Sequence, residues 1–350
     1  MIKTEFNLEN LLRDNIKTIK PYSSARDEYK DVVTDGMVFI DANENPFDTT
    51  VNRYPDPQQT KVKERLSELK EISVNQMLLG NGSDEVLDLI FRAFCEPNQD
   101  NVITLPPTYG MYSVLANLNA VEIKEVKLNT DFQPNIEAIE EVIDKYSKLL
   151  FICSPNNPTA NSFEAEKIEV LITSFSGIVV IDEAYIDFST QESWLCRLNE
   201  FPNLIITQTL SKAYGLAGIR LGVCYASKEI ISVLNSIKPP YNVNQLSQDK
   251  ALERLNEIED VKHEIDAVLG QREMLMSELK SIAIIKKVYV SDANFLLVKV
   301  DDANRRYQQL IEKGIVVRNR TNQFLCENCL RFTVGTAEEN KKLIKTLNEL

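Results

Sequence analysis

The chain of 350 residues is long enough for about two domains, and a hydrophobic content of 43% suffices for a sizeable core. A formal net charge of −13 argues against nucleic acid and anionic membranes as main partners, because such a surface repels polyanions. The first residues hold no long apolar run, and no stretch reaches the roughly 18 apolar residues of a membrane span. We therefore expect a cytoplasmic protein whose main partner is neither nucleic acid nor a membrane.

The cysteine and histidine content argues against a metal site. Six cysteines are present, and in a cytoplasmic chain we expect them to be reduced. Cys326 and Cys329 form a lone C-x-x-C, but a metal would need two more ligands nearby, and the only histidine is His263. His263 lies in a charged, helix-like stretch and is interpreted as part of a solvated helix face. We expect no metal and no histidine-based catalysis.

The chain begins with a predicted N-terminal arm, residues 1–36, that holds a short amphipathic helix near 8–15. A strand is predicted at 37–41, and prolines then force turns as far as residue 57. From about residue 58, helix-like and strand-like patterns alternate. Helices are predicted at 58–70, 84–94, 109–118, 136–145 and 163–173, and strands at 101–105, 149–153, 178–181, 204–207 and 221–225.

These strand-like runs are apolar on both faces, which indicates a mostly parallel sheet covered by helices on both sides. We assign this large α/β domain to residues 37–240, ending at the Lys238-Pro239-Pro240 break. A long polar helical stretch is predicted at 244–279. Two strands, a helix and further elements follow it, so residues 241–350 are predicted to form a smaller α/β domain.

Two polar loops follow predicted strands and suit ligand binding. Residues 80–85 (GNGSDE) open the helix predicted at 84–94, where glycines and free N–H groups could seat a phosphate. An ordinary capped helix start explains this segment equally well. Residues 154–159 (SPNNPT) lie at the carboxyl end of a predicted parallel strand, where such sheets bind ligands, although a plain turn is the alternative.

Three charged residues lie at or after the next strands. Asp182 ends a strand that should be buried on both faces, so its carboxylate needs a positive partner, which a protonated cofactor ring nitrogen or a structural cation could supply. Lys212 lies in a loop of small and hydroxyl residues after the strand at 204–207, and Arg220 could clamp a phosphate. A lysine near positive charge in a dry pocket can act as an amine nucleophile, whereas a lone lysine is more often a surface residue. All four loops follow strands of one predicted sheet, so we expect them to converge.

These segments resemble the fold-type-I pyridoxal-phosphate aminotransferases. The shared motifs are GNGSDE, SPNNPT, the DEAY at 182–185, and the lysine and arginine at 212 and 220. The segments PYSSAR at 21–26 and NRYPD at 52–56 make the chain most similar to the histidinol-phosphate aminotransferase family. The resemblance covers about residues 20 to 340 and implies a large domain with a seven-stranded type of sheet, a smaller C-terminal domain and an N-terminal arm.

The resemblance also implies the cofactor, pyridoxal 5'-phosphate, and its contacts. Lys212 would bind it as a Schiff base and move the proton, Asp182 would pair with the ring nitrogen, and Tyr185 would assist at the ring's phenolic oxygen. The implied cofactor contacts are Gly82, Ser83, Asp84, Tyr109, Asn157, Asp182, Tyr185, Thr209, Ser211, Lys212, Arg220 and Tyr54, the last from the partner subunit of a homodimer.

By the same resemblance the substrates are L-histidinol phosphate and 2-oxoglutarate, and the products are imidazole acetol phosphate and L-glutamate, as in histidine biosynthesis. The implied substrate-binding residues are Tyr22, Tyr54, Asn157, Arg318 and Arg331. A planar guanidinium suits both phosphate and carboxylate. Three alternatives stay open: a threonine-phosphate decarboxylase, an aromatic amino-acid aminotransferase, and, more remotely, a Rossmann-type nucleotide-binding protein.

One residue departs from the family pattern. Ala160 follows SPNNPT where the family usually has glycine. If the backbone there has positive φ, alanine would cost about 1 kcal/mol relative to glycine. The departure bears on the local geometry of the loop and not on the type of reaction.

Overall fold

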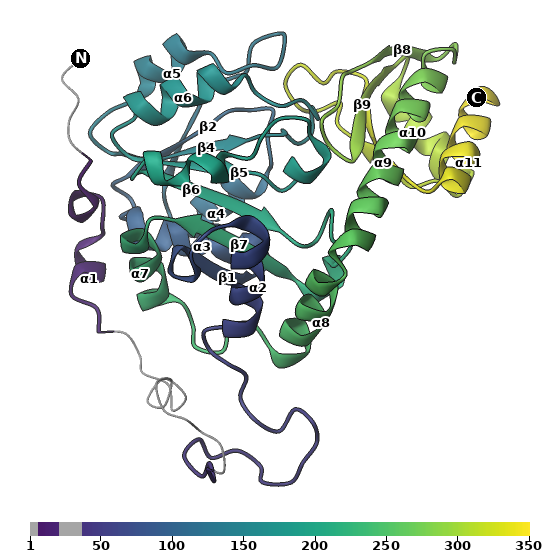
Figure 1. The fold of residues 1–350 in the computed structure, drawn as a ribbon. Helices are drawn as coiled ribbons and strands as arrows, with labels where there is room; N and C mark the ends of the chain where they lie inside the picture. Colours follow the sequence, from purple (N-terminus) through teal and green to yellow (C-terminus); the bar gives the residue numbers. More distant parts are fainter. Residues whose placement is uncertain (1–5, 21–36) are drawn as a thin grey trace.

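The structure, a computed structural model, describes residues 6–20 and 37–350. Its larger part is a seven-stranded sheet in the order β1-β7-β6-β5-β4-β2-β3, in which β7 alone runs antiparallel to its neighbours (Figure 1). The mostly parallel α/β sheet predicted from the alternating pattern is thereby confirmed. The strands are β1 (Met77–Asn81), β2 (Asn101–Thr104), β3 (Glu122–Glu125), β4 (Ser147–Cys153), β5 (Ile178–Asp182), β6 (Leu204–Thr209) and β7 (Leu221–Ala226).

Helices cover both faces of this sheet because neighbouring strand residues alternate between them. In β4, Leu149 and Phe151 pack with α3, α4 and α7, whereas Leu150 and Ile152 pack with α2, α5 and α6. Every residue of β2, β5, β6 and β7 is buried, which explains the continuous apolar runs. The helices are α2 (Thr60–Lys70), α3 (Ser83–Phe94), α4 (Met111–Leu118), α5 (Ile136–Val142), α6 (Ala165–Ser174) and α7 (Lys228–Ile237).

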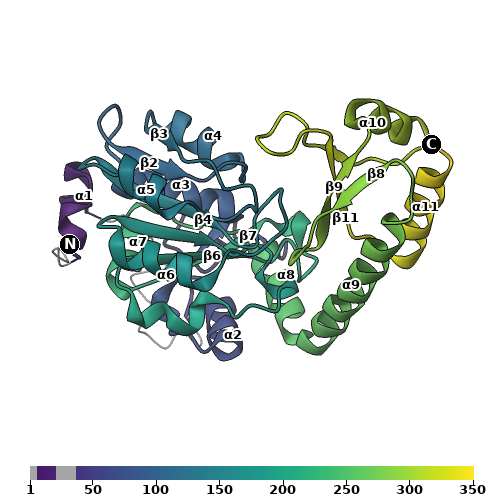
Figure 2. The same ribbon diagram turned by 90° about the horizontal axis from the view of Figure 1, so that it is seen from above.

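A second, smaller α/β unit lies beside the first and is reached along the helix α9 (Figure 2). Its four strands run in the order β10-β11-β9-β8. Alternation in β9 again separates two cores, because Phe295 and Leu297 pack toward the large sheet while Leu296 and Val298 pack with α9, α10 and α11. The elements are α8 (Gln245–Asn256), α9 (Ile258–Leu279), β8 (Ile285–Val288), β9 (Phe295–Val300), α10 (Ala303–Glu312), β10 (Arg318–Asn319), β11 (Cys329–Thr333) and α11 (Ala337–Asn348).

Three predicted elements were wrong in form. The helix near 8–15 is instead a 3-10 turn, Leu8–Asn10, and a short helix α1, Asp14–Lys17, because the backbone of Arg13 between them is extended. The strand at 37–41 is absent, and its apolar Val38 and Ile40 are 84% and 90% exposed, with no sheet to bury them. The stretch at 244–279 is two helices, since Glu257 leaves helical geometry between α8 and α9.

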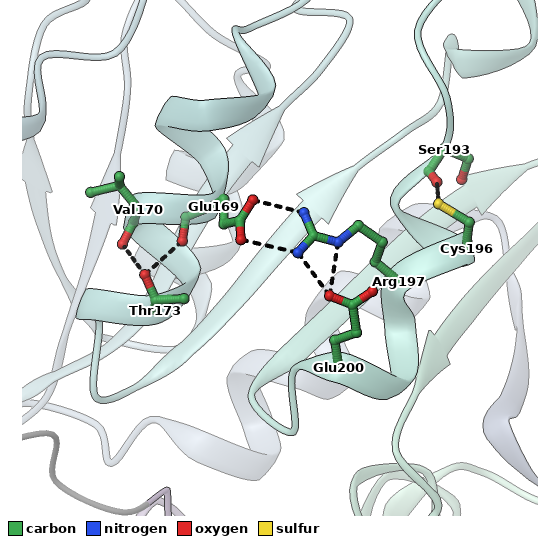
Figure 3. Close-up of polar contacts among 7 residues, drawn as sticks. All are labelled: Glu169, Val170, Thr173, Ser193, Cys196, Arg197 and Glu200. Carbon is green, nitrogen blue, oxygen red and sulfur yellow. Dashed lines mark hydrogen bonds and ion pairs between the residues drawn. The ribbon is translucent and has the colours of Figure 1, made fainter.

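A charged network fixes the segment after β5 to helix α6 (Figure 3). Arg197, in the 3-10 helix Trp194–Glu200, donates two hydrogen bonds to the carboxylate of Glu169 on α6 and two more to Glu200. Its guanidinium also lies over the rings of Trp194 and Phe201, at 5.4 and 5.0 Å from their centroids. The network orients the connection that leads from β5 to β6.

No helix in residues 6–20 or 37–350 is both long enough and apolar enough to cross a membrane.

Candidate active site

The four predicted loops meet at one edge of the large sheet. They follow β1, β4, β5 and β6, which all run in the same direction, so their carboxyl ends share that edge. The loops enclose a cavity lined by Ser83, Asp84, Tyr109, Cys153, Asn157, Asp182, Ala184, Tyr185, Thr209, Ser211, Lys212 and Arg220. Ten of these twelve were predicted from the sequence; Cys153 and Ala184 were not.

One part of the cavity, at the start of α3, suits a phosphate, and we call it the phosphate seat. Helix α3 begins at Ser83, after Gly82 with φ +82°. A side chain at Gly82 would put its Cβ 2.8 Å from Nη2 of Arg220, and one at Gly222 would put its Cβ 2.3 Å from the backbone nitrogen of Ser83. Glycine at both positions therefore leaves the free N–H groups of the helix open beside a guanidinium.

Hydroxyl groups complete this seat. The Thr209 hydroxyl donates to Ser211 Oγ at 2.9 Å, and the Ser211 backbone N–H donates to Thr209 Oγ1 at 3.1 Å. Asp84 turns its carboxylate toward Arg220, at 3.4 Å, and accepts a hydrogen bond from the Tyr109 hydroxyl at 3.1 Å. The side chain of Asp84 thus orients a cation and an aromatic ring.

Asp182 lies at the floor of the cavity, at the end of β5, and is 3% exposed. Burial raises the pKa of its carboxyl, and hydrogen bonds from the Tyr112 hydroxyl and the Ala184 backbone N–H act in the opposite direction. These donors lie 2.8 Å from Oδ2 and 3.1 Å from Oδ1. No ion pair of Asp182 occurs within the described part of the chain, so this fixed, buried carboxylate suits a cationic group of a ligand.

The opposite wall joins the two sheets. Asn157 donates from Nδ2 to the Tyr185 hydroxyl at 3.4 Å, and its Oδ1 accepts a hydrogen bond from Arg331 Nη1 at 2.6 Å. Burial is the main cause that raises the pKa of Tyr185, which keeps the phenol protonated. Arg331 belongs to β11, so the small sheet contributes a cation at this wall of the cavity.

Lys212 lies at the mouth of the cavity, with its Nζ 5.8 Å from the ring centroid of Tyr185. The residue as a whole is exposed, yet partial desolvation of the amine and the charges of Arg331 and Arg220 lower its pKa. Both causes favour a neutral, nucleophilic amine.

Five predicted residues are not among the cavity lining. Gly82 precedes Ser83 of the lining, and Arg331 contacts the lining through Asn157. The other three are Tyr54, Arg318 and Tyr22. Tyr54 stacks on Tyr241 at 4.6 Å and lines a separate cavity with residues 43–44, 51–55 and 244–246. Arg318 lies in β10 opposite Arg331 and is exposed. Tyr22 lies outside the residues that the structure describes.

The cavity's lysine, buried aspartate and phosphate seat suit a pyridoxal-phosphate enzyme, and comparisons with known proteins agree. The model of the aminotransferase class I and II family matches residues 38–347. A histidinol-phosphate aminotransferase of Flavobacterium johnsoniae is 63% identical over 99% of both chains, and that of Christiangramia forsetii is 62% identical over the same shares. The chain belongs to the histidinol-phosphate aminotransferase family.

Solved structures show the same fold at low sequence identity. The histidinol-phosphate aminotransferase of Clostridium acetobutylicum has a TM-score of 0.79 at 23% identity, covering 86% of this chain and 91% of its own. That of Sinorhizobium meliloti, in complex with pyridoxal-5'-phosphate, has a TM-score of 0.77 at 20% identity, covering 86% and 83%. A threonine-phosphate decarboxylase of Porphyromonas gingivalis has 0.73 at 21%, covering 85% and 90%. The fold-type-I prediction is confirmed.

Sequence reasoning missed Tyr112, the residue that holds Asp182 in this member of the family. Its ring is fully buried and stacks on Phe151 at 4.8 Å, so the sequence pattern around it is that of an ordinary aromatic residue of the core. We expect Tyr112→Phe to weaken binding of pyridoxal phosphate by about 1.5–3 kcal/mol, the range for a hydrogen bond to a charged group, with little change in fold. Titration of the apoprotein with the cofactor measures this. Tyr225→Phe, at an equally buried tyrosine of β7, is the control, and an equal loss in both variants would contradict the prediction.

Ala160 adopts the backbone conformation that favours glycine, with φ +70°, while its side chain is fully buried. Ala160→Gly would relieve about 1 kcal/mol of backbone strain but remove a buried methyl worth a similar amount. We therefore expect the free energy of unfolding to change by less than about 1 kcal/mol, as measured by urea denaturation. A loss of several kcal/mol would show that the methyl group holds the loop.

Proposed function

We propose that the protein transfers the amino group of L-histidinol phosphate to 2-oxoglutarate, giving imidazole acetol phosphate and L-glutamate. The observation that carries the proposal is the placing of Lys212, Asp182 and the Arg331–Asn157 pair around one cavity. A nucleophilic amine, a buried carboxylate and an anion-binding guanidinium are the groups that transamination of an anionic substrate needs. The names of relatives at 63% and 62% identity support the choice of substrate.

The residues present fit pyridoxal 5'-phosphate. The phosphate would bind at the N-terminus of α3 beside Arg220, in the space that a Cβ on Gly82 would fill. Asp182 would face the protonated ring nitrogen, and Asn157 and Tyr185 would contact the phenolic oxygen. Tyr109 would lie on the face of the ring. When bound, the cofactor supplies an electron sink next to the substrate carbon that loses its proton.

The chain's own groups would hold the substrate and move the proton. Lys212 would hold the cofactor through Nζ and, once displaced by the substrate amine, carry a proton on the same nitrogen. The charges of Arg331 and Arg220 lower the pKa of Lys212 beyond the effect of desolvation, so the amine is available as a base nearer to neutral pH. Arg331 and Arg318 would bind the phosphate of the substrate or the carboxylate of glutamate.

We propose a homodimer whose partner subunit completes the site. Residues 37–56 form an extended segment with exposed apolar side chains, among them Val38, Ile40 and Phe47. Such a patch on a chain this acidic suits an interface with a second copy. Tyr54 lies at the end of this segment and would reach the cofactor phosphate of the other subunit, while Tyr22 stays the predicted cover of the substrate. The domain limits at 36/37 and 240/241 remain proposals as well.

The decisive experiment is a spectroscopic half-reaction. The protein is purified with pyridoxal phosphate, and its visible spectrum is recorded while L-histidinol phosphate is added without an oxo acid. We expect the band of the lysine-linked cofactor to disappear and to return on addition of 2-oxoglutarate. An unchanged band would refute this substrate, and release of carbon dioxide from threonine phosphate, or turnover of aromatic amino acids alone, would select one of the rival enzymes.

A further inference from the structure

Three arginines lie on one face of the small sheet, the face turned toward the cavity. Arg318 is the register partner of Arg331, so their side chains share a face. The backbone N–H of Arg320 donates to the Cys329 carbonyl at 2.9 Å, which extends the same ladder past the end of β10. Because alternate residues of a strand share a face, the side chain of Arg320 lies on that of Arg318 and Arg331.

Contacts of Arg331 and Phe295 hold this face of the small sheet against the cavity. Arg331 Nη1 reaches Asn157 across the two units, and its guanidinium lies 5.1 Å from the ring centroid of Phe295. Phe295 in turn packs edge-on against Tyr185, a residue of the cavity lining, at 5.0 Å. Arg320 itself interacts electrostatically with Tyr185. The third arginine is therefore a neighbour of the cavity and not of bulk solvent alone.

The positive charge of these arginines is not compensated within the described residues. None of the three forms an ion pair with a carboxylate there. The Nε atoms of Arg320 and Arg331 are buried and lack a hydrogen-bond partner. Burial and the charge of Arg318 lower the pKa of Arg320, and burial and the charge of Arg320 lower that of Arg331 to about 10. Buried donors and repelling cations are costly unless an anion binds between them.

We propose that Arg320 is a third cation of the substrate's anion subsite and makes this subsite prefer a phosphate monoester to a carboxylate. The inference rests on the proposed function and names a residue that sets its specificity. A phosphate monoester carries about −1.5 to −2 charges and three acceptor oxygens at pH 7, whereas a carboxylate carries one charge and two oxygens. Two arginines are enough to bind the two oxygens and single charge of a carboxylate. A third arginine therefore strengthens binding mainly of the phosphate dianion.

The test compares the two amino donors in steady-state kinetics of the holoenzyme. Arg320→Gln is expected to raise KM for L-histidinol phosphate by about 10- to 100-fold, the range for a charge-assisted hydrogen bond, and KM for glutamate by at most about threefold. Arg320→Lys keeps the charge but loses the planar fork, and we expect an intermediate effect. Arg305→Gln, at an exposed arginine of α10, is the matched control, and the cofactor spectrum checks that each variant is loaded.

Inorganic phosphate separates a failure of this inference from a failure of the proposed function. With the cofactor bound, its own phosphate seat is filled, so inorganic phosphate should inhibit by competing at the substrate subsite, and more weakly in Arg320→Gln. Equal inhibition of both proteins, no inhibition of the wild type, or equal changes of KM for both donors would overturn the role of Arg320. If wild type ignores L-histidinol phosphate while Arg320→Gln relieves phosphate inhibition, the proposed function fails and the assignment of Arg320 stands.

Discussion

Replacing Lys212 by alanine is expected to lower kcat/KM by about 10⁴-fold or more, because the change removes both the covalent attachment and the proton carrier. The visible band of the lysine-linked cofactor should vanish, while the N-terminus of α3 should still bind the phosphate of the cofactor without a covalent bond. Stopped assays of amino transfer, together with the absorption spectrum and the mass of the borohydride-reduced protein, measure the effect.

Two companion variants sharpen this result. Lys212→Arg restores the positive charge but not the nucleophile, and we expect it to stay inactive. Lys228→Ala, at an exposed lysine of α7, should behave like wild type. A Lys212→Ala protein that keeps the band, or a reduced cofactor attached to another lysine, would refute the assignment.

Asp182→Asn is expected to lower kcat/KM by on the order of 10²–10³-fold, the usual effect of losing one preorganised charge in a dry site. The same change should not destabilise the apoprotein. Burial raises the pKa of Asp182 in the folded state, so above that pKa the charged carboxyl opposes folding, and a neutral amide removes this penalty. Pyridoxal phosphate should then raise the Tm of the wild type more than that of the variant.

Thermal unfolding with and without cofactor separates a ligand-binding role from a structural one. If Asp182 served only a structural ion pair, Asp182→Asn would lower the Tm of the apoprotein and leave the gain from the cofactor intact. Asp266→Asn, at an exposed position of α9, is the control for the loss of one negative charge.

The loops of the site were predictable because each follows a buried strand, and a parallel sheet brings the ends of such strands together. Asp182 and Lys212 were found by this rule, because Asp182 places a charge at the end of an apolar strand and Lys212 lies in the loop after the next strand. Tyr112 was not found, because a helical aromatic that packs in a core looks the same in sequence whether or not its hydroxyl meets a carboxylate. Arg320 was missed because only the pairing of β10 with β11 shows which face it shares.

The buried strands of the fold were predictable from the sequence, and the exposed elements were not. The continuous apolar runs of β5 and β6 indicate buried strands in the sequence. The four residues of β3 are all exposed or half-buried, so that strand has no such pattern. The prediction of a strand at 37–41 was wrong although the sequence there has a strand-like pattern. Its alternation of apolar residues is real, but Val38 and Ile40 are exposed in the single chain, and alternation alone does not say which surface will cover them.

The hydrogen bond between Arg331 and Asn157 joins residues 174 positions apart and belongs to neither sheet alone. An anion that binds Arg331 through Nη1 must first replace the amide oxygen of Asn157, which acts as an intramolecular competitor for that donor. Its effective concentration depends on how closely the two sheets approach. Anion affinity and sheet separation are therefore linked in both directions: an anion at Arg331 loosens one tie between the sheets, and a movement that parts them frees the arginine for its ligand.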